Sequence, residues 1–119
     1  MKFMVLVKSK PDLEARIESM MGSPEMKTAM AAMEAFNDEL RTAGVMVDCD
    51  GLALSREGKR VRFDGAHRSV VDGPFQGDLV AGYWIWELSS IEEAVAWVER
   101  CPNPMPVPSE IEIRPFGSV

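Results

Sequence analysis

The segment Gly82-Tyr83-Trp84-Ile85-Trp86-Glu87-Leu88 is rich in aromatic and β-branched residues, which is typical of a β-strand. Alternate side chains of a strand point to opposite faces of the sheet. Its two tryptophans and Leu88 therefore lie on one face, and Tyr83 and Ile85 lie on the other. Because one layer of helices covers only one face of a sheet, this strand needs cover on both sides.

Residues 2–8 (KFMVLVK) form a second such segment, in which three apolar residues on one face oppose Met4 and Leu6 on the other. A second copy packed sheet to sheet is the simplest cover for the remaining face. A patch of several hundred Å² represents on the order of 10 kcal/mol of gross transfer free energy. Since patches of that size are uncommon on stable monomers, the sequence predicts a homodimer.

Two helices have clear N-terminal signals. Ser23 is an N-cap candidate followed by Pro24 at the first helical position, and Gly44 is a natural stop. Ser90 and Glu93 fit a capping box that opens a later helix, which ends near Pro102. The first of these helices carries an apolar stripe, Met26, Met30, Met33, Phe36 and Leu40. We interpret its methionines as core filling rather than as a flexible binding groove.

The remaining segments complete the fold. A short helix is predicted around residues 13–20, and a strand from residues 45–47 that continues at 52–54. A hairpin is predicted from residues 60–64 and 69–72. Residues 102–108, with four prolines, predict an extended connection to a last strand at 110–114. This order of strands and helices predicts an α+β, ferredoxin-like sandwich with an antiparallel sheet and an inserted hairpin.

The chain has 119 residues, with 13 Lys and Arg against 19 Asp and Glu, a formal charge of −6. We expect a single domain over residues 1–119. The acidic balance argues against a nucleic-acid partner, which needs cations facing phosphates. The apolar runs are too short to span a bilayer, and residues 1–7 lack a signal-peptide pattern. Two cysteines provide neither a disulfide framework nor a zinc site, so we expect a reduced, cytoplasmic protein.

The segment Asp72-Gly73-Pro74-Phe75 allows two interpretations. In the structural one, Asp72 bonds nearby backbone, and the glycine and proline shape a tight turn. In the functional one, Asp72 is a general base in a cleft roofed by Phe75 and the aromatic strand, where apolar walls raise a carboxyl pKa. The sequence leaves both open.

Other residues could complete such a cleft. Arg62 and Arg114 would favour an anionic ligand if a second copy half-buries them, and Tyr83 is an aromatic candidate for the same cleft. The single histidine, His67, falls beside the hairpin turn, where we expect a solvated residue. Since the sequence contains no metal-ligand cluster and no cofactor fingerprint, we expect neither a metal nor a cofactor.

Many short motifs, taken in order, give the chain a family resemblance. They are SPE (23–25), FNDEL (36–40), AGV (43–45), GL (51–52), RVRF (60–63), DGPF (72–75), AGYW (81–84), EEA (92–94), Trp97, CP (101–102) and EIEIRP (110–115). With this pattern the chain resembles YCII-related proteins of the DGPF type over nearly its full length.

The resemblance implies a dimeric α+β barrel, built from two ferredoxin-like subunits that pair through their sheets. The wider superfamily includes small monooxygenases and muconolactone-isomerase-like enzymes. Many YCII-related members carry a His–Asp pair in a cleft, and DGPF-type members are associated with bacterial sigma-factor systems. Two features depart from the pattern: residues 26–40 contain no histidine that could assist Asp72, and the segment after Phe75 is short.

Three kinds of function therefore stay open. The first is an enzyme or binder that takes a small anionic or aromatic metabolite, with proton transfer by Asp72. The second is a non-catalytic regulatory or accessory dimer, for example one linked to a sigma-factor system. The third is a small-molecule sensor or an orphan dimer. The sequence does not separate them.

Overall fold

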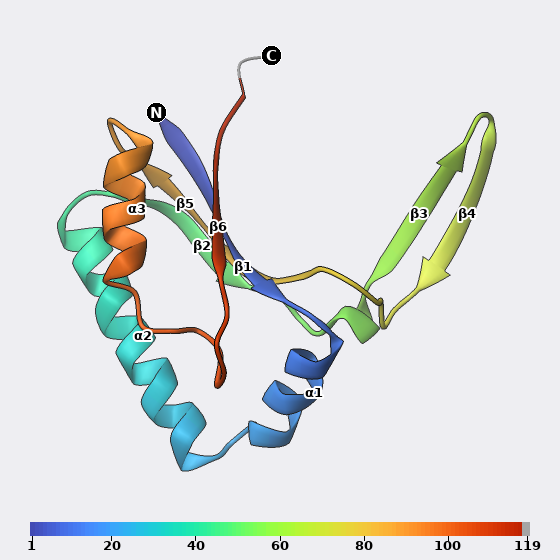
Figure 1. The fold of residues 1–119 in the computed structure, drawn as a ribbon, viewed down its shortest axis with the longest axis horizontal. Helices are drawn as coiled ribbons and strands as arrows, with labels where there is room; N and C mark the ends of the chain where they lie inside the picture. Colours follow the sequence, from blue (N-terminus) through green and yellow to red (C-terminus); the bar gives the residue numbers. More distant parts are fainter. Residues whose placement is uncertain (118–119) are drawn as a thin grey trace.

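A four-stranded antiparallel sheet is the centre of the structure, a computed structural model that describes residues 1–117 (Figure 1). The strand order is β2-β5-β1-β6, with bounds Met46–Gly51, Leu79–Glu87, Lys2–Ser9 and Ile111–Pro115. The predicted strands at 2–8, 82–88 and 110–114 are confirmed with small shifts of their ends. β1 and β5 are the two central strands, so the segments that need most cover lie in the middle of the sheet.

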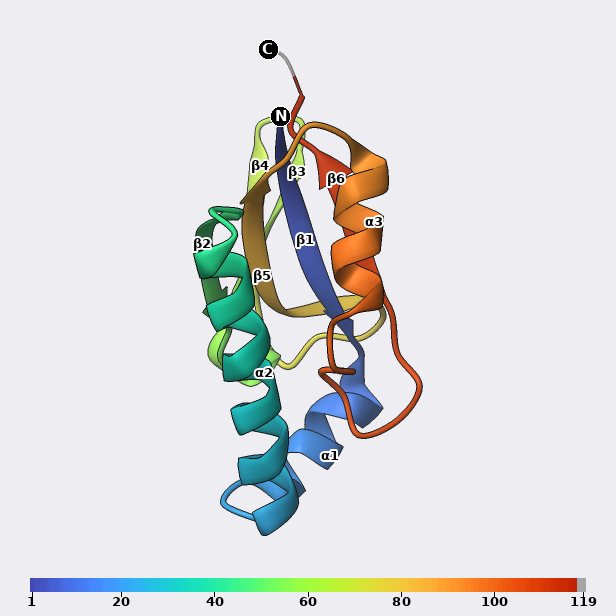
Figure 2. The ribbon, with the colours of Figure 1, turned by 90° about the vertical axis from the view of Figure 1, so that its left-hand side faces the viewer.

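Three helices accompany the sheet, and α2 (Pro24–Thr42) and α3 (Ile91–Glu99) lie on the same face of it (Figure 2). The N-caps are the predicted ones. Ser23 Oγ accepts a hydrogen bond from the Met26 amide at 3.1 Å, and Ser90 Oγ accepts one from the Glu93 amide at 3.2 Å. α1 (Pro11–Met20) leads from β1 to the start of α2. No helix within residues 1–117 is both long enough and apolar enough to cross a membrane.

The core lies between the sheet and the helices. In the register of β1 with β5, Phe3 stands opposite Trp86 and Val5 opposite Trp84, and all four side chains are buried. Phe36 of α2 packs on them, with its ring edge-on to Trp84 at a centroid distance of 6.1 Å. Strand–helix–strand units with both principal helices on one face make this a ferredoxin-like α+β fold, as the sequence predicted.

The face of the sheet opposite the helices is apolar only at its centre. Its half-buried residues from β1 and β5 are Met4, Leu6, Tyr83 and Ile85, and we call this set the open face. The outer strands add charges on the same side, because Asp48 pairs with Ile85 in register and Arg114 pairs with Met4. The central strands thus have two apolar faces as predicted, within a charged rim.

The predicted hairpin is present as β3 (Lys59–Asp64) and β4 (His67–Asp72), which form a sheet of their own. Figure 1 shows that it projects from the body, and Figure 2 places it behind the sheet, on the side away from α2 and α3. Residues 59–72 are called the arm below.

Two predictions about connecting segments are wrong. Residues 52–54 are not a strand, because β2 ends at Gly51 and the chain turns into a short 3-10 helix, Ser55–Glu57. Residues 102–108 are not extended. The Asn103 side chain donates to the Val107 carbonyl at 2.9 Å and accepts from the Met105 amide at 3.0 Å, which folds this segment into a loop.

Candidate functional site

A cavity of about 640 Å³ opens on the helical side of the sheet. One wall is α2, and the others come from α1, the strands β2 and β5, and the two segments whose conformation the sequence missed. Both segments contribute directly, since Leu52 and Leu54 line one side and Pro104 and Met105 another. The volume falls within the roughly 300–1,000 Å³ that ligand pockets occupy.

The apolar wall of the cavity is built by methionines of α2. Met26, Met30 and Met33 all line it, and Met30 is 64% exposed. The prediction that these residues fill the core is therefore wrong for Met30, whereas Met33 packs against the core and Phe36 and Leu40 are buried as expected. The helix extends past the sheet, so its first turns have no strand to pack on and their apolar side faces the cavity instead.

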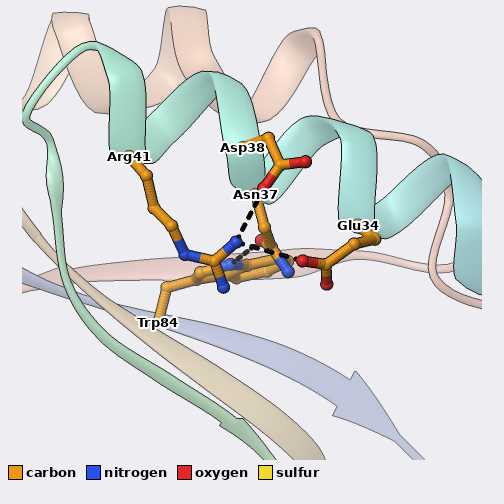
Figure 3. A network of polar contacts seen from close by, with 5 residues as sticks. All are labelled: Glu34, Asn37, Asp38, Arg41 and Trp84. Carbon is orange, nitrogen blue, oxygen red and sulfur yellow. Dashed lines mark hydrogen bonds and ion pairs between the residues drawn. The ribbon is translucent and has the colours of Figure 1, made fainter.

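The polar end of the cavity is a network on the second half of α2, shown in Figure 3. One guanidinium nitrogen of Arg41 donates to Glu34 at 3.1 Å and to Asp38 at 3.0 Å. Next to it, Asn37 Oδ1 accepts a hydrogen bond from Trp84 Nε1 at 2.8 Å. That bond satisfies the indole N–H. It uses the carbonyl oxygen of Asn37, so the amide hydrogens of Asn37 take no part in it.

The charge at this end is negative. Arg41 and Glu34 line the cavity, and the second carboxylate on Arg41 comes from Asp38. One cation is thus shared by two carboxylates, which leaves this end with a net negative charge. Such a wall favours neutral or cationic groups over an anion.

Two further residues at the rim hold their protons. Cys49 lines the cavity, and partial burial raises the pKa of its thiol, with Asp48 and Asp50 adding to the effect. Tyr83 donates its hydroxyl hydrogen to Asp48 at 3.0 Å, and this bond raises the pKa of the phenol. Neither group is activated as a nucleophile or base, because both stay protonated at neutral pH.

Of the five site candidates predicted from the sequence, only Tyr83 borders this cavity within residues 1–117, and its side chain lies on the open face. Asp72 ends β4, with its side chain 73% exposed and its Oδ1 2.5 Å from Lys59 Nζ. Arg62 is exposed on β3, and the register places it on the opposite face of the arm from Asp72. Arg114 lies on β6, where it donates to Glu112 at 3.1 Å. The structure does not bring these residues together within one subunit.

Phe75 belongs to a joint between the arm and the body. Its amide donates to Ser55 Oγ at 3.2 Å, and the guanidinium of Arg60 lies 4.0 Å from the centre of its ring. Ser55 is fixed in turn by Glu14, whose carboxylate accepts from the Ser55 amide at 2.6 Å and from its hydroxyl at 2.5 Å. Residues 73–75 thus form a structural joint, while Asp72 pairs with the Lys59 side chain rather than with nearby backbone as the structural interpretation expected.

No group of three or more potential metal-binding side chains occurs among the described residues. His67 is exposed on the arm and pairs in register with Asp64. Sequence reasoning missed three residues that line the cavity, Glu34, Arg41 and Cys49. One sequence pattern could have indicated two of them. Glu34, Asn37 and Arg41 follow the 3–4 residue spacing of one helix side, beside the methionine stripe, but only the position of β5 shows that this side faces a cavity.

The comparison with known proteins gives one positive finding. The family model of the YCII-related domain matches residues 1–116, which is nearly the whole chain. No curated protein matches it. The chain therefore belongs to the YCII-related domain family.

Proposed function

We propose that this protein binds a small, neutral, largely apolar or aromatic molecule in the cavity between α2 and the sheet. The observation that carries the proposal is the make-up of the cavity: a wall of methionines with Trp84 at one side, and a few polar groups gathered at one end. Methionine side chains adapt to irregular apolar shapes and favour contact with aromatic rings. Pockets of this kind use few polar groups to orient a ligand.

Electrostatics supports the aromatic rather than the anionic ligand class. Asn37 offers amide hydrogens as donors, and Glu34 offers as an acceptor the carboxylate oxygen that does not bond Arg41; both residues line the cavity, which suits a hydroxyl or amide group. A carboxylate in the same place would lie beside Glu34 and Asp38 and one cation that is already paired with both.

We also propose that the protein is a homodimer in which the open faces of two copies pack together. Met4, Leu6, Tyr83 and Ile85 are the central residues of that face, and no helix covers them. Each 100 Å² of apolar surface removed from water contributes about 2.5 kcal/mol of gross free energy. The cavity lies on the opposite face of the sheet, so such a pairing leaves it open to ligand.

Binding does not by itself separate an enzyme from a ligand-responsive accessory dimer. Proton transfer by Asp72 is the catalytic alternative, and it would need a second subunit to enclose this exposed carboxylate. Asp72→Asn distinguishes the two roles of the residue. If Asp72 only pairs with Lys59 on the surface, the free energy of unfolding changes by less than about 1 kcal/mol and ligand binding is unchanged. A loss of turnover or of pH-dependent binding at the same stability would establish the base.

Cys49 offers a direct test of cavity binding, because it lines the cavity and the other cysteine does not. We expect neutral 1-naphthol to slow alkylation of Cys49 by iodoacetamide, measured by mass spectrometry of the cleaved protein. Its anionic analogue 1-naphthoate should protect Cys49 less at equal concentration. Equal reactivity with and without 1-naphthol would contradict the proposal, and stronger protection by 1-naphthoate would contradict the ligand class.

A matched pair of variants on α2 controls this experiment. Ala29 lines the cavity, so Ala29→Phe should occupy the space and weaken the protection by about tenfold or more, which corresponds to 1.4 kcal/mol. Ala35 is exposed on the opposite side of the same helix, and Ala35→Phe should leave the protection unchanged. Protection that survives Ala29→Phe would place the binding site elsewhere.

A further inference from the structure

The arm is a two-stranded sheet separate from the four-stranded one. Within residues 1–117, β3 and β4 pair only with each other. An isolated two-stranded hairpin is at best marginally stable in water. Its position also matters, because Figures 1 and 2 place it on the same side of the sheet as the open face.

The base of the arm is nevertheless held firmly. The Gly73 amide donates to the Gly58 carbonyl at 2.9 Å, and the Gly58 amide donates to the Ser55 carbonyl at 2.9 Å. Together with Phe75 and Glu14, these contacts fix both ends of the arm to the 3-10 helix. These contacts therefore fix the orientation of the arm relative to the 3-10 helix.

One face of the arm is apolar and exposed. Directly paired residues of an antiparallel ladder share a face, and Val61 pairs with Val70 while Phe63 pairs with Arg68. The exposed fractions of Val61, Val70 and Phe63 are 50%, 63% and 71%. Three large, exposed apolar side chains on one face of a hairpin form an apolar patch, and such patches are typical of interaction surfaces.

The charge of the arm is opposite to that of the rest of the protein. Residues 59–72 contain four Lys and Arg against two Asp, a formal charge of +2, while the other residues carry nine against 17, which is −8. The acidic strand nearest the open face is β2, an edge strand on which Asp48 and Asp50 are exposed. A second copy therefore complements the arm: its open face is apolar, and the carboxylates that border it are opposite in charge to the arm.

From these observations we infer that the arm docks on a second copy of the chain, with its apolar face, which also carries Lys59 and Arg68, against the partner's open face and β2. The inference rests on the homodimer proposed above and adds a specific contact to it. In a two-fold symmetric pair each arm lies along the other subunit, because arm and open face share one side of the sheet. The charges then set the register of the pair as well as its affinity.

Sedimentation equilibrium of the full chain tests this. Phe63→Ser removes the most exposed side chain of the apolar face and should raise the dimer dissociation constant by about tenfold or more. Met21→Ser is the matched control, since Met21 is equally exposed, at 70%, but lies between α1 and α2. It should leave the constant within about twofold. Circular dichroism of both variants checks that the subunit stays folded.

Charge gives a second, independent readout. The wild-type dissociation constant should rise with salt, and Arg68→Glu, on the apolar face of the arm, should raise it further and reduce its salt dependence. If Phe63→Ser and Arg68→Glu both leave the dimer unchanged, the arm contacts something else and the inference is overturned. Leu6→Glu distinguishes that failure from failure of the sheet pairing, because it alone places a charge at the centre of the open face. A wild-type monomer at high concentration would overturn both.

Discussion

Gly73 allows the chain to pass very close to the backbone of Ser55. An added Cβ at this residue would overlap the carbonyl oxygen of Ser55, so the two chain segments approach too closely for any side chain. The sequence indicated a turn here, and the turn is real. What the sequence could not show is the partner of the close approach, because Ser55 and Gly73 are far apart in the chain and meet only when the arm forms.

Gly73→Ala should therefore destabilise the protein, because the joint must open to admit a methyl group. We expect a loss of about 1–3 kcal/mol in the free energy of unfolding, the usual cost of overpacking. Urea denaturation followed by tryptophan fluorescence measures it. Gly51→Ala is the control, since an added Cβ there meets no atom within 4 Å. Equal stability of the two variants would contradict the close approach.

Cys101 gives a pH-dependent prediction at the same scale. Burial raises the pKa of its thiol to about 11, well above that of a free cysteine. Only the thiolate is alkylated, so the rate of alkylation should rise about tenfold per pH unit between pH 8 and pH 10. A Cys49→Ser variant isolates the signal for mass spectrometry. A rate that levels off near pH 9 would mean that Cys101 has an ordinary pKa.

At the scale of elements, the sequence was most informative where one local pattern is enough to identify a strand or the start of a helix. Strand alternation identified β1 and β5, and the caps Ser23 and Ser90 placed the starts of α2 and α3. It was least informative for the linking segments after β2 and after α3, whose conformation depends on tertiary contacts. These segments complete the cavity, which explains why the fold could be predicted while the candidate site could not.

The cap of α2 allows a quantitative check. Ser23→Ala removes the acceptor for the Met26 amide and should lower the free energy of unfolding by about 1 kcal/mol. Ser23→Asp should retain most of the stability, because its carboxylate accepts the same bond and suits the helix N-terminus. Thermal unfolding of the three proteins provides the comparison. If Ser23→Asp is as unstable as Ser23→Ala, the cap is not the source of the effect.

For the whole molecule, we propose a different function for each face of the sheet: ligand binding on the helical face and pairing with a second copy on the other. The helical face carries both the core and the cavity, whereas the other face carries the open apolar centre, the acidic β2 and the arm. Sequence alternation indicated that both faces need cover. It did not indicate a separate cavity, because the methionines of α2 have the same spacing whether they fill a core or line a pocket.

The most direct test of the proposed function is a ¹H–¹⁵N NMR titration of the protein with 1-naphthol. Binding in the cavity should shift the indole Nε1–H signal of Trp84 and the side-chain amide signals of Asn37, which are joined at 2.8 Å. The backbone amides of Asp72 and Phe75 should stay in place. Shifts confined to Asp72, Phe75 and their neighbours, with Trp84 and Asn37 unchanged, would show that the ligand site is at the arm and that the cavity is not the functional site.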